Sequence, residues 1–183
     1  MVRFIAMLLA ASGLAAAAIP GPGTYTISQE DRSLALKQSK GIAIASQSNA
    51  TESAQQWVLE STQGSKCGTF KVKNVKFGTY LGYPPRNVRD LAGSPIVGVE
   101  GPVQFTLFPG NKPDEFYLMS KERMGINYEP FGPLPANADE FPKVFLRQQY
   151  GYELPWVFKK APAPAPAPAY AGGDKSQESC SPN

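Results

Sequence analysis

The sequence predicts an all-β protein built from three copies of a four-strand unit, because strand-like openings and closings recur at a near-constant spacing. The openings are "GTYTIS", "GTFKVK" and "DEFYLM". They place Tyr25, Phe70 and Phe116 at matching positions, 45 and 46 residues apart (70 − 25 and 116 − 70). A period in this range is typical of repeat architectures in which each repeat is one supersecondary unit.

The closings repeat with a similar period. They are "QQWVLE", "VQFTLF" and "LPWVFK", with Trp57, Phe105 and Trp156 at matching positions, 48 and 51 residues apart (105 − 57 and 156 − 105). Each aromatic is followed, after one spacer, by another large apolar residue. Such alternation predicts strands with one buried face.

Two further alternating segments lie between each opening and its closing. They are residues 33–38 and 41–46 in the first unit, 78–83 and 95–100 in the second, and 124–129 and 143–148 in the third. Their period of two and the Gly, Pro, Asn and Ser residues around them predict strands. No segment shows a helical period.

Three units that cannot bury their apolar faces alone must close around a shared core. A six-stranded barrel capped by three hairpins achieves this and removes free sheet edges. This architecture is a β-trefoil. We therefore expect Trp57, Phe105 and Trp156 to be buried at equivalent places, each stabilising the fold by about 1.5–3 kcal/mol.

The two ends of the chain differ in composition from the repeats. Residues 1–18 combine Arg3, an apolar run and a small-residue end, which predicts a signal peptide and a secreted protein. Residues 161–183 begin with alternating Ala and Pro, which predicts a disordered tail in extended polyproline form. The trefoil domain is expected over residues 19–160. No later segment approaches the ~20 apolar residues of a membrane span.

Charge and composition exclude several function classes. The 183 residues carry 18 Lys+Arg and 15 Asp+Glu, a net charge of +3 with no basic stripe, which argues against nucleic acid as a partner. There is no histidine, so histidine-dependent catalysis and His-ligated zinc are excluded. The acidic residues show no paired arrangement of the kind a two-carboxylate hydrolase needs. We expect a protein that is not an enzyme and needs no cofactor or metal.

Three residues suggest covalent modification. Cys67 and Cys180 could pair in an oxidising compartment, or Cys180 could pair with another chain while Cys67 stays buried. Asn49 begins the sequon Asn-Ala-Thr, a possible N-glycosylation site in a eukaryotic secretory route.

A family resemblance rests on the first closing segment. Gln55-Gln56-Trp57 resembles the Gln-x-Trp signature of ricin-B-type trefoil lectins, and the other two units keep only the aromatic. The region from Gly23 to Lys160 is similar to small fungal lectins of this type. The resemblance implies glycans or glycoproteins as partners. Of the aspartates that this family carries early in each unit, only Asp31 is present.

Two carbohydrate pockets are predicted by residue type, because sugar recognition needs an aromatic face and planar polar partners. The resemblance points to Tyr83 and Gln104 in the second unit. The third unit offers Asn127, Tyr128 and Tyr150. For the tyrosines, packing within strands or loops is the competing interpretation.

An alternative function follows from a second fungal family with the same fold, the trefoil peptidase inhibitors. These act through exposed, rigid loops, and two proline-rich segments, residues 82–90 and 129–142, have that character. Arg86 or Arg89 could enter a trypsin-like pocket of a secreted protease. Ordinary turns of a sheet protein are the more common reason for such prolines.

Overall fold

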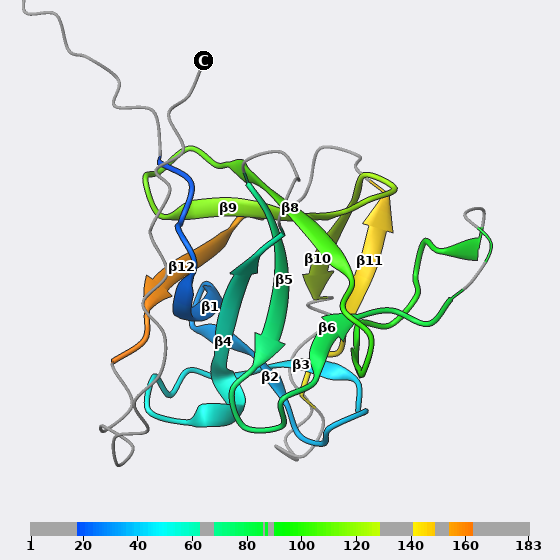
Figure 1. Cartoon of the computed structure of the whole chain (residues 1–183), viewed down its shortest axis with the longest axis horizontal. Coiled ribbons are helices and arrows are strands. Elements are labelled where there is room, and N and C mark those ends of the chain that lie inside the picture. The colour runs from blue at the N-terminus through cyan, green and yellow to red at the C-terminus, as the bar shows by residue number, and fades with distance from the viewer. Residues whose placement is uncertain are drawn as a thin grey trace, which may run out of the picture.

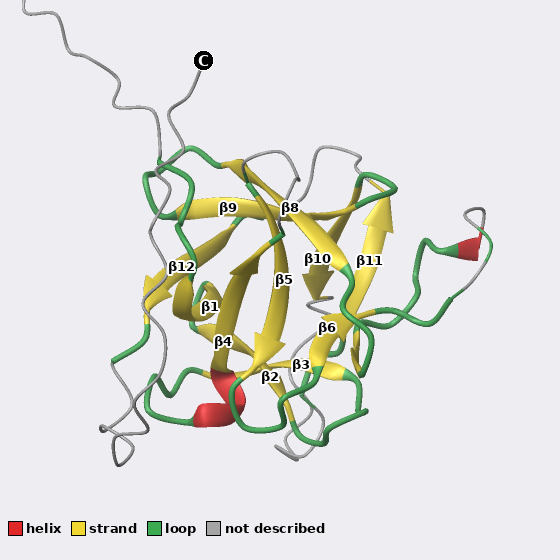
Figure 2. Cartoon of the chain, viewed as in Figure 1, coloured by secondary structure: helices red, strands yellow, loops and turns green. Residues whose placement is uncertain are grey.

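The computed structural model describes residues 18–62, 68–85, 87, 90–128, 141–148 and 154–162, and within them nearly all of the regular secondary structure is β (Figure 2). The strands are β1 (Gly23–Gln29), β2 (Arg32–Leu36), β3 (Ala43–Gln47), β4 (Gln56–Ser61), β5 (Thr69–Asn74), β6 (Tyr80–Gly82), β7 (Val97–Val99), β8 (Gln104–Pro109), β9 (Glu115–Ser120), β10 (Met124–Tyr128), β11 (Val144–Gln148) and β12 (Trp156–Lys160). A single-turn 3-10 helix, η1 (Ser53–Gln55), precedes β4.

Six of these strands close into a barrel (Figure 1). Antiparallel pairing runs from β1 to β4, β5, β8, β9 and β12, and β12 pairs back with β1. These are the first and last strands of the three predicted units. Closure leaves no free edge in the barrel, as the repeat pattern predicts.

The remaining strands form one hairpin per unit: β2 with β3, β6 with β7, and β10 with β11. The hairpins meet at the pseudo-threefold axis. There Ala43 N donates to Ile96 O at 2.7 Å and Ile96 N donates to Val144 O at 2.8 Å. All three residues have no exposed surface. The predicted β-trefoil is confirmed.

The three closing aromatics occupy equivalent places in the core. Trp57, Phe105 and Trp156 are each 0% exposed, as predicted. The two indoles also satisfy buried backbone carbonyls: Trp57 Nε1 donates to Leu34 O at 2.8 Å and Trp156 Nε1 donates to Ile126 O at 2.7 Å. Phe105 lacks this donor, so the second unit keeps the apolar contact alone.

Several predictions fall wholly or mostly outside the described residues. Both cysteines and Tyr150 lie there, as do residues 1–17 of the predicted signal peptide and residues 163–183 of the tail. Among the helices of the described ranges, none has the length and apolar character needed to cross a membrane.

Candidate functional site

Tyr83 and Tyr128, the two described tyrosines predicted to contact sugar, occupy equivalent positions in the second and third units. Each packs edge-on against the closing aromatic of its own unit. The ring centroids of Tyr83 and Phe105 are 6.2 Å apart at 75°, and those of Tyr128 and Trp156 are 6.2 Å apart at 62°. Tyr128 is 6% exposed, so its ring presents no face on which a sugar could stack.

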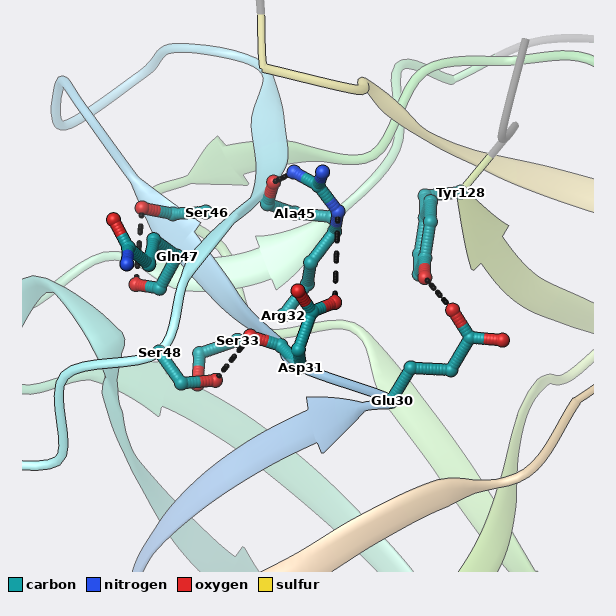
Figure 3. A network of polar contacts seen from close by, with 9 residues as sticks. All are labelled: Glu30, Asp31, Arg32, Ser33, Ala45, Ser46, Gln47, Ser48 and Tyr128. Carbon is teal, nitrogen blue, oxygen red and sulfur yellow. Dashed lines mark hydrogen bonds and ion pairs between the residues drawn. The ribbon is translucent and has the colours of Figure 1, made fainter. Parts of the chain in front are cut away.

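The tyrosine hydroxyls connect neighbouring units. Tyr83 Oη donates to Glu122 Oε2 at 2.7 Å, and Tyr128 Oη donates to Glu30 Oε2 at 3.3 Å. Each glutamate lies in the first turn of the next unit, and Figure 3 shows the second of these pairs beside Asp31 and Arg32. Burial first, then the nearby Glu30 carboxylate, raises the pKa of Tyr128 to about 12. The same two causes, with Glu122 as the carboxylate, raise the pKa of Tyr83.

The polar residues predicted to accompany these tyrosines point elsewhere. Gln104 is exposed and neighbours Phe105 on β8, so the two side chains project to opposite faces of the strand. Tyr83 packs on the Phe105 side, and the first predicted pocket is therefore not assembled. Asn127 is half-buried, and its Oδ1 accepts a hydrogen bond from the Tyr128 backbone N at 3.1 Å. Sugar binding by these residues stays a prediction.

The described surface is hollowed on the first unit instead. Two open hollows of about 430 and 390 Å³ share Ser46, Glu52 and Phe141. The larger adds Leu36, Ile44, Lys37 and Lys76. The smaller adds Gln47, Ser48, Asn49 and Gln55. We call the pair the Phe141 hollow.

Gln55, the first residue of the Gln-x-Trp signature, fixes the polar wall of this hollow. It is 1% exposed, because η1 turns it inward. Its Nε2 donates to Gln47 O at 2.9 Å and to Glu52 Oε2 at 3.1 Å, and its Oε1 accepts from Asn49 N at 2.7 Å. One buried amide thus holds residues 47–52 in a single arrangement.

A second polar network lies behind this wall. Ser33 Oγ donates to Ser48 Oγ at 2.9 Å, and Ser48 Oγ donates to Asp31 O at 2.9 Å. The Asp31 carboxylate is 85% exposed and lies 3.9 Å from Arg32 Nε (Figure 3). These bonds tie the turn after β1 to the end of β3, which carries the residues that line the hollow.

Phe141, a half-buried aromatic, also lines the hollow and is held by its neighbours. Pro142 O accepts a hydrogen bond from Ala45 N at 2.8 Å, which fixes this segment beside β3. Lys37 Nζ lies 4.5 Å from the centroid of the Phe141 ring. Such cation–π contacts orient both partners.

These groups suit a polyhydroxyl ligand. The hollow offers an aromatic ring, a carboxylate, hydroxyls, amides and ammonium groups, which together can contact the apolar face of a sugar ring and its hydroxyls. Within the described ranges, no group of His, Cys, Asp or Glu residues could hold a metal ion. The groups that line the hollow can contact a ligand through an aromatic ring and through hydrogen bonds.

Sequence reasoning did not identify this hollow. A signal was present, because the signature at Gln55 and the sequon at Asn49 lie close together in the first unit. Phe141 carried no signal of its own. It belongs to the proline-rich segment 129–142, of which residues 129–140 are outside the described ranges, as are Arg86 and Arg89.

Comparisons with known proteins bear on the fold. No protein family and no curated protein matches the sequence. Among solved structures, the Rhizoctonia solani agglutinin superposes with a TM-score of 0.63 at 19% identity, covering 77% of this chain and 96% of that one. The ricin B-like lectin of Macrolepiota procera, solved with lactose, gives 0.61 at 16% identity, covering 78% and 99%.

A third similar structure is the Polyporus squamosus lectin bound to the epitope Neu5Acα2-6Galβ1-4GlcNAc. It gives a TM-score of 0.61 at 21% identity over 78% of this chain and 50% of that one, so the chain spans half of that lectin. At these identities the likeness concerns the fold alone. The structural neighbours thus include fungal ricin B-like lectins.

Proposed function

We propose that this protein is a secreted, non-catalytic lectin that binds glycans in the Phe141 hollow. The observation that carries the proposal is the position of Phe141: a half-buried aromatic residue that lines the same hollow as a set of polar groups, on a fold shared with lectins. Aromatic rings in such positions supply the apolar contact that sugar rings need.

The fixed geometry of the polar wall supports binding. Because Gln55 already orders residues 47–52, little conformational entropy remains to be lost when a ligand docks. Glu52 Oε2 accepts one hydrogen bond from Gln55 and keeps capacity for a sugar hydroxyl. An open hollow of this kind suits one terminal sugar, for which a Kd near 1 mM corresponds to about −4 kcal/mol.

A glycan array probed with the full chain, produced in bacteria so that Asn49 carries no glycan, tests the proposal. The array includes lactose and Neu5Acα2-6Galβ1-4GlcNAc, the ligands of two similar structures, beside a broad panel of other glycans. We expect a signal that free sugar competes away. A blank array would refute the proposal, and tight inhibition of trypsin alongside it would favour the peptidase-inhibitor alternative.

A further inference from the structure

The sequon Asn49-Ala50-Thr51 lies at the edge of the Phe141 hollow. Asn49 lines the smaller of its two parts, together with Phe141 and Glu52. Residues 47–52 are all exposed, and they form the turn that leads from β3 into η1. A group attached to Asn49 would therefore start beside the residues proposed to bind glycan.

The turn presents the Asn49 side chain for modification. Its Oδ1 accepts hydrogen bonds from Thr51 Oγ1 at 2.8 Å and from Thr51 N at 3.2 Å, and Glu52 N donates to Asn49 O at 3.1 Å. The amide oxygen is thus engaged within the turn. Among the described residues, no hydrogen bond involves Asn49 Nδ2, which leaves the nitrogen that a glycan would occupy accessible.

We propose that Asn49 is N-glycosylated during export and that the attached oligosaccharide covers the Phe141 hollow. In this step Asn49 Nδ2 attacks C1 of the first sugar of a polyprenyl-diphosphate oligosaccharide supplied by the secretory pathway. The Nδ2–C1 bond forms, the bond between C1 and the phosphate oxygen breaks, the diphosphate leaves, and Nδ2 loses one proton. No oxidation or reduction occurs.

The covering follows from effective concentration and rests on the proposed function. A ligand tethered by a short flexible link has an effective concentration in the millimolar range. The expected affinity of the hollow for one sugar is also about millimolar. The tethered glycan would therefore compete with free glycans, and the occupancy of the sequon would set how much of the hollow is open.

The experiment compares forms of the full chain secreted from yeast. The wild-type protein, a Thr51→Ala variant that lacks the sequon and a Thr51→Ser variant that retains it are analysed by mass spectrometry of the Asn49 peptide. We expect an oligosaccharide on the wild type and on Thr51→Ser, and none on Thr51→Ala. An unmodified Asn49 in the wild type would overturn the inference.

Hydroxyl-radical footprinting then measures access to Phe141. Phe108, 51% exposed and not part of the hollow, serves as the internal reference. Relative to a sample trimmed by endoglycosidase H to one N-acetylglucosamine, the intact glycan should lower oxidation of Phe141 by about half or more and leave Phe108 unchanged. Equal oxidation of Phe141 in the two samples would overturn the covering.

The two proposals can fail separately. Footprinting needs no external ligand. A blank array for Thr51→Ala would refute the lectin function and with it the argument from affinity, and a protected Phe141 would then show that the attached glycan covers the hollow by its position alone. If Thr51→Ala binds the array no more strongly than the glycosylated wild type, while the wild type binds well, the covering is refuted and the lectin function stands.

Discussion

Tyr128 and Phe141 are aromatic residues with opposite placements in the same fold, the first buried and the second half-buried. Tyr83 and Tyr128 occupy equivalent positions of the repeat, and both pack against a closing aromatic. Phe141 directly precedes Pro142. The carbonyl of Pro142 accepts a backbone hydrogen bond from another unit, and the carbonyls of Gly41 and Ser94 do the same in the other two units. Phe141 is therefore equivalent in the repeat to Lys40 and Gly93, and only the third unit carries an aromatic at this position.

This difference shows how to separate core from surface in a threefold protein. An aromatic that recurs from unit to unit is constrained by the shared core. An aromatic that occurs in one unit alone has no equivalent partner in the core and can lie at the surface. By this criterion Tyr128 belongs to the core and Phe141 belongs to the candidate site, while sugar binding at Tyr83 stays a prediction.

The largest expected effect is on Tyr128. The Tyr128→Ala change removes a buried ring from contact with Trp156 and leaves a cavity, so we expect a loss of about 3 kcal/mol in the free energy of unfolding. Urea denaturation followed by tryptophan fluorescence measures it. A change below about 1 kcal/mol would place this ring among surface residues.

A smaller effect is expected for the Trp156→Phe change, which gives the third unit the aromatic that the second unit already has. The barrel accepts Phe105 at this position, but Ile126 O would lose its buried hydrogen bond from the indole. We expect a cost of about 2 kcal/mol from the unsatisfied carbonyl and the lost area. Denaturation should give the same result for Trp57→Phe, because Leu34 O has the same role. Unchanged stability in both variants would show that these bonds contribute nothing.

The tyrosine hydroxyl should make stability depend on alkaline pH. Burial and Glu30 raise the pKa of Tyr128 from 10.0 to about 12, so the unfolded chain loses this proton before the folded chain does. The folded state therefore gains stability that is fully present below pH 10 and is lost as the pH rises from 10 to 12. Denaturation midpoints across this range should fall less steeply for Tyr128→Phe. Identical slopes for the wild type and Tyr128→Phe would contradict the raised pKa of Tyr128.

The smallest effect on folding is expected at Phe141. Phe141 is half-buried and lines an open hollow beside Lys37, so Phe141→Ala should change the free energy of unfolding by less than about 1 kcal/mol. The same denaturation assay serves as the measurement. A loss of unfolding free energy as large as that of Tyr128→Ala would show that Phe141 is a core residue, and the contrast with Tyr128 would then be wrong.

Much of the fold could be predicted from the period of the sequence, because strand alternation and closing aromatics such as Trp57 reflect local packing rules. The site could not. The burial of Tyr128 depends on Glu30, 98 residues away, and on Trp156 beneath it. The position of Phe141 depends on Ala45 in another unit. Such contacts between units leave no trace in the spacing of the sequence, so aromatic residue type alone could not tell the buried Tyr128 from the half-buried Phe141.

The most direct test of glycan binding at Phe141 is calorimetric titration of two matched variants with the strongest ligand from the array. Both are made without the sequon, in the Thr51→Ala background. We expect Phe141→Ala to lose about tenfold in affinity, or 1.4 kcal/mol, while Tyr128→Phe binds like the parent. Unchanged binding by Phe141→Ala together with weakened binding by Tyr128→Phe would contradict the account and return the site to the tyrosines.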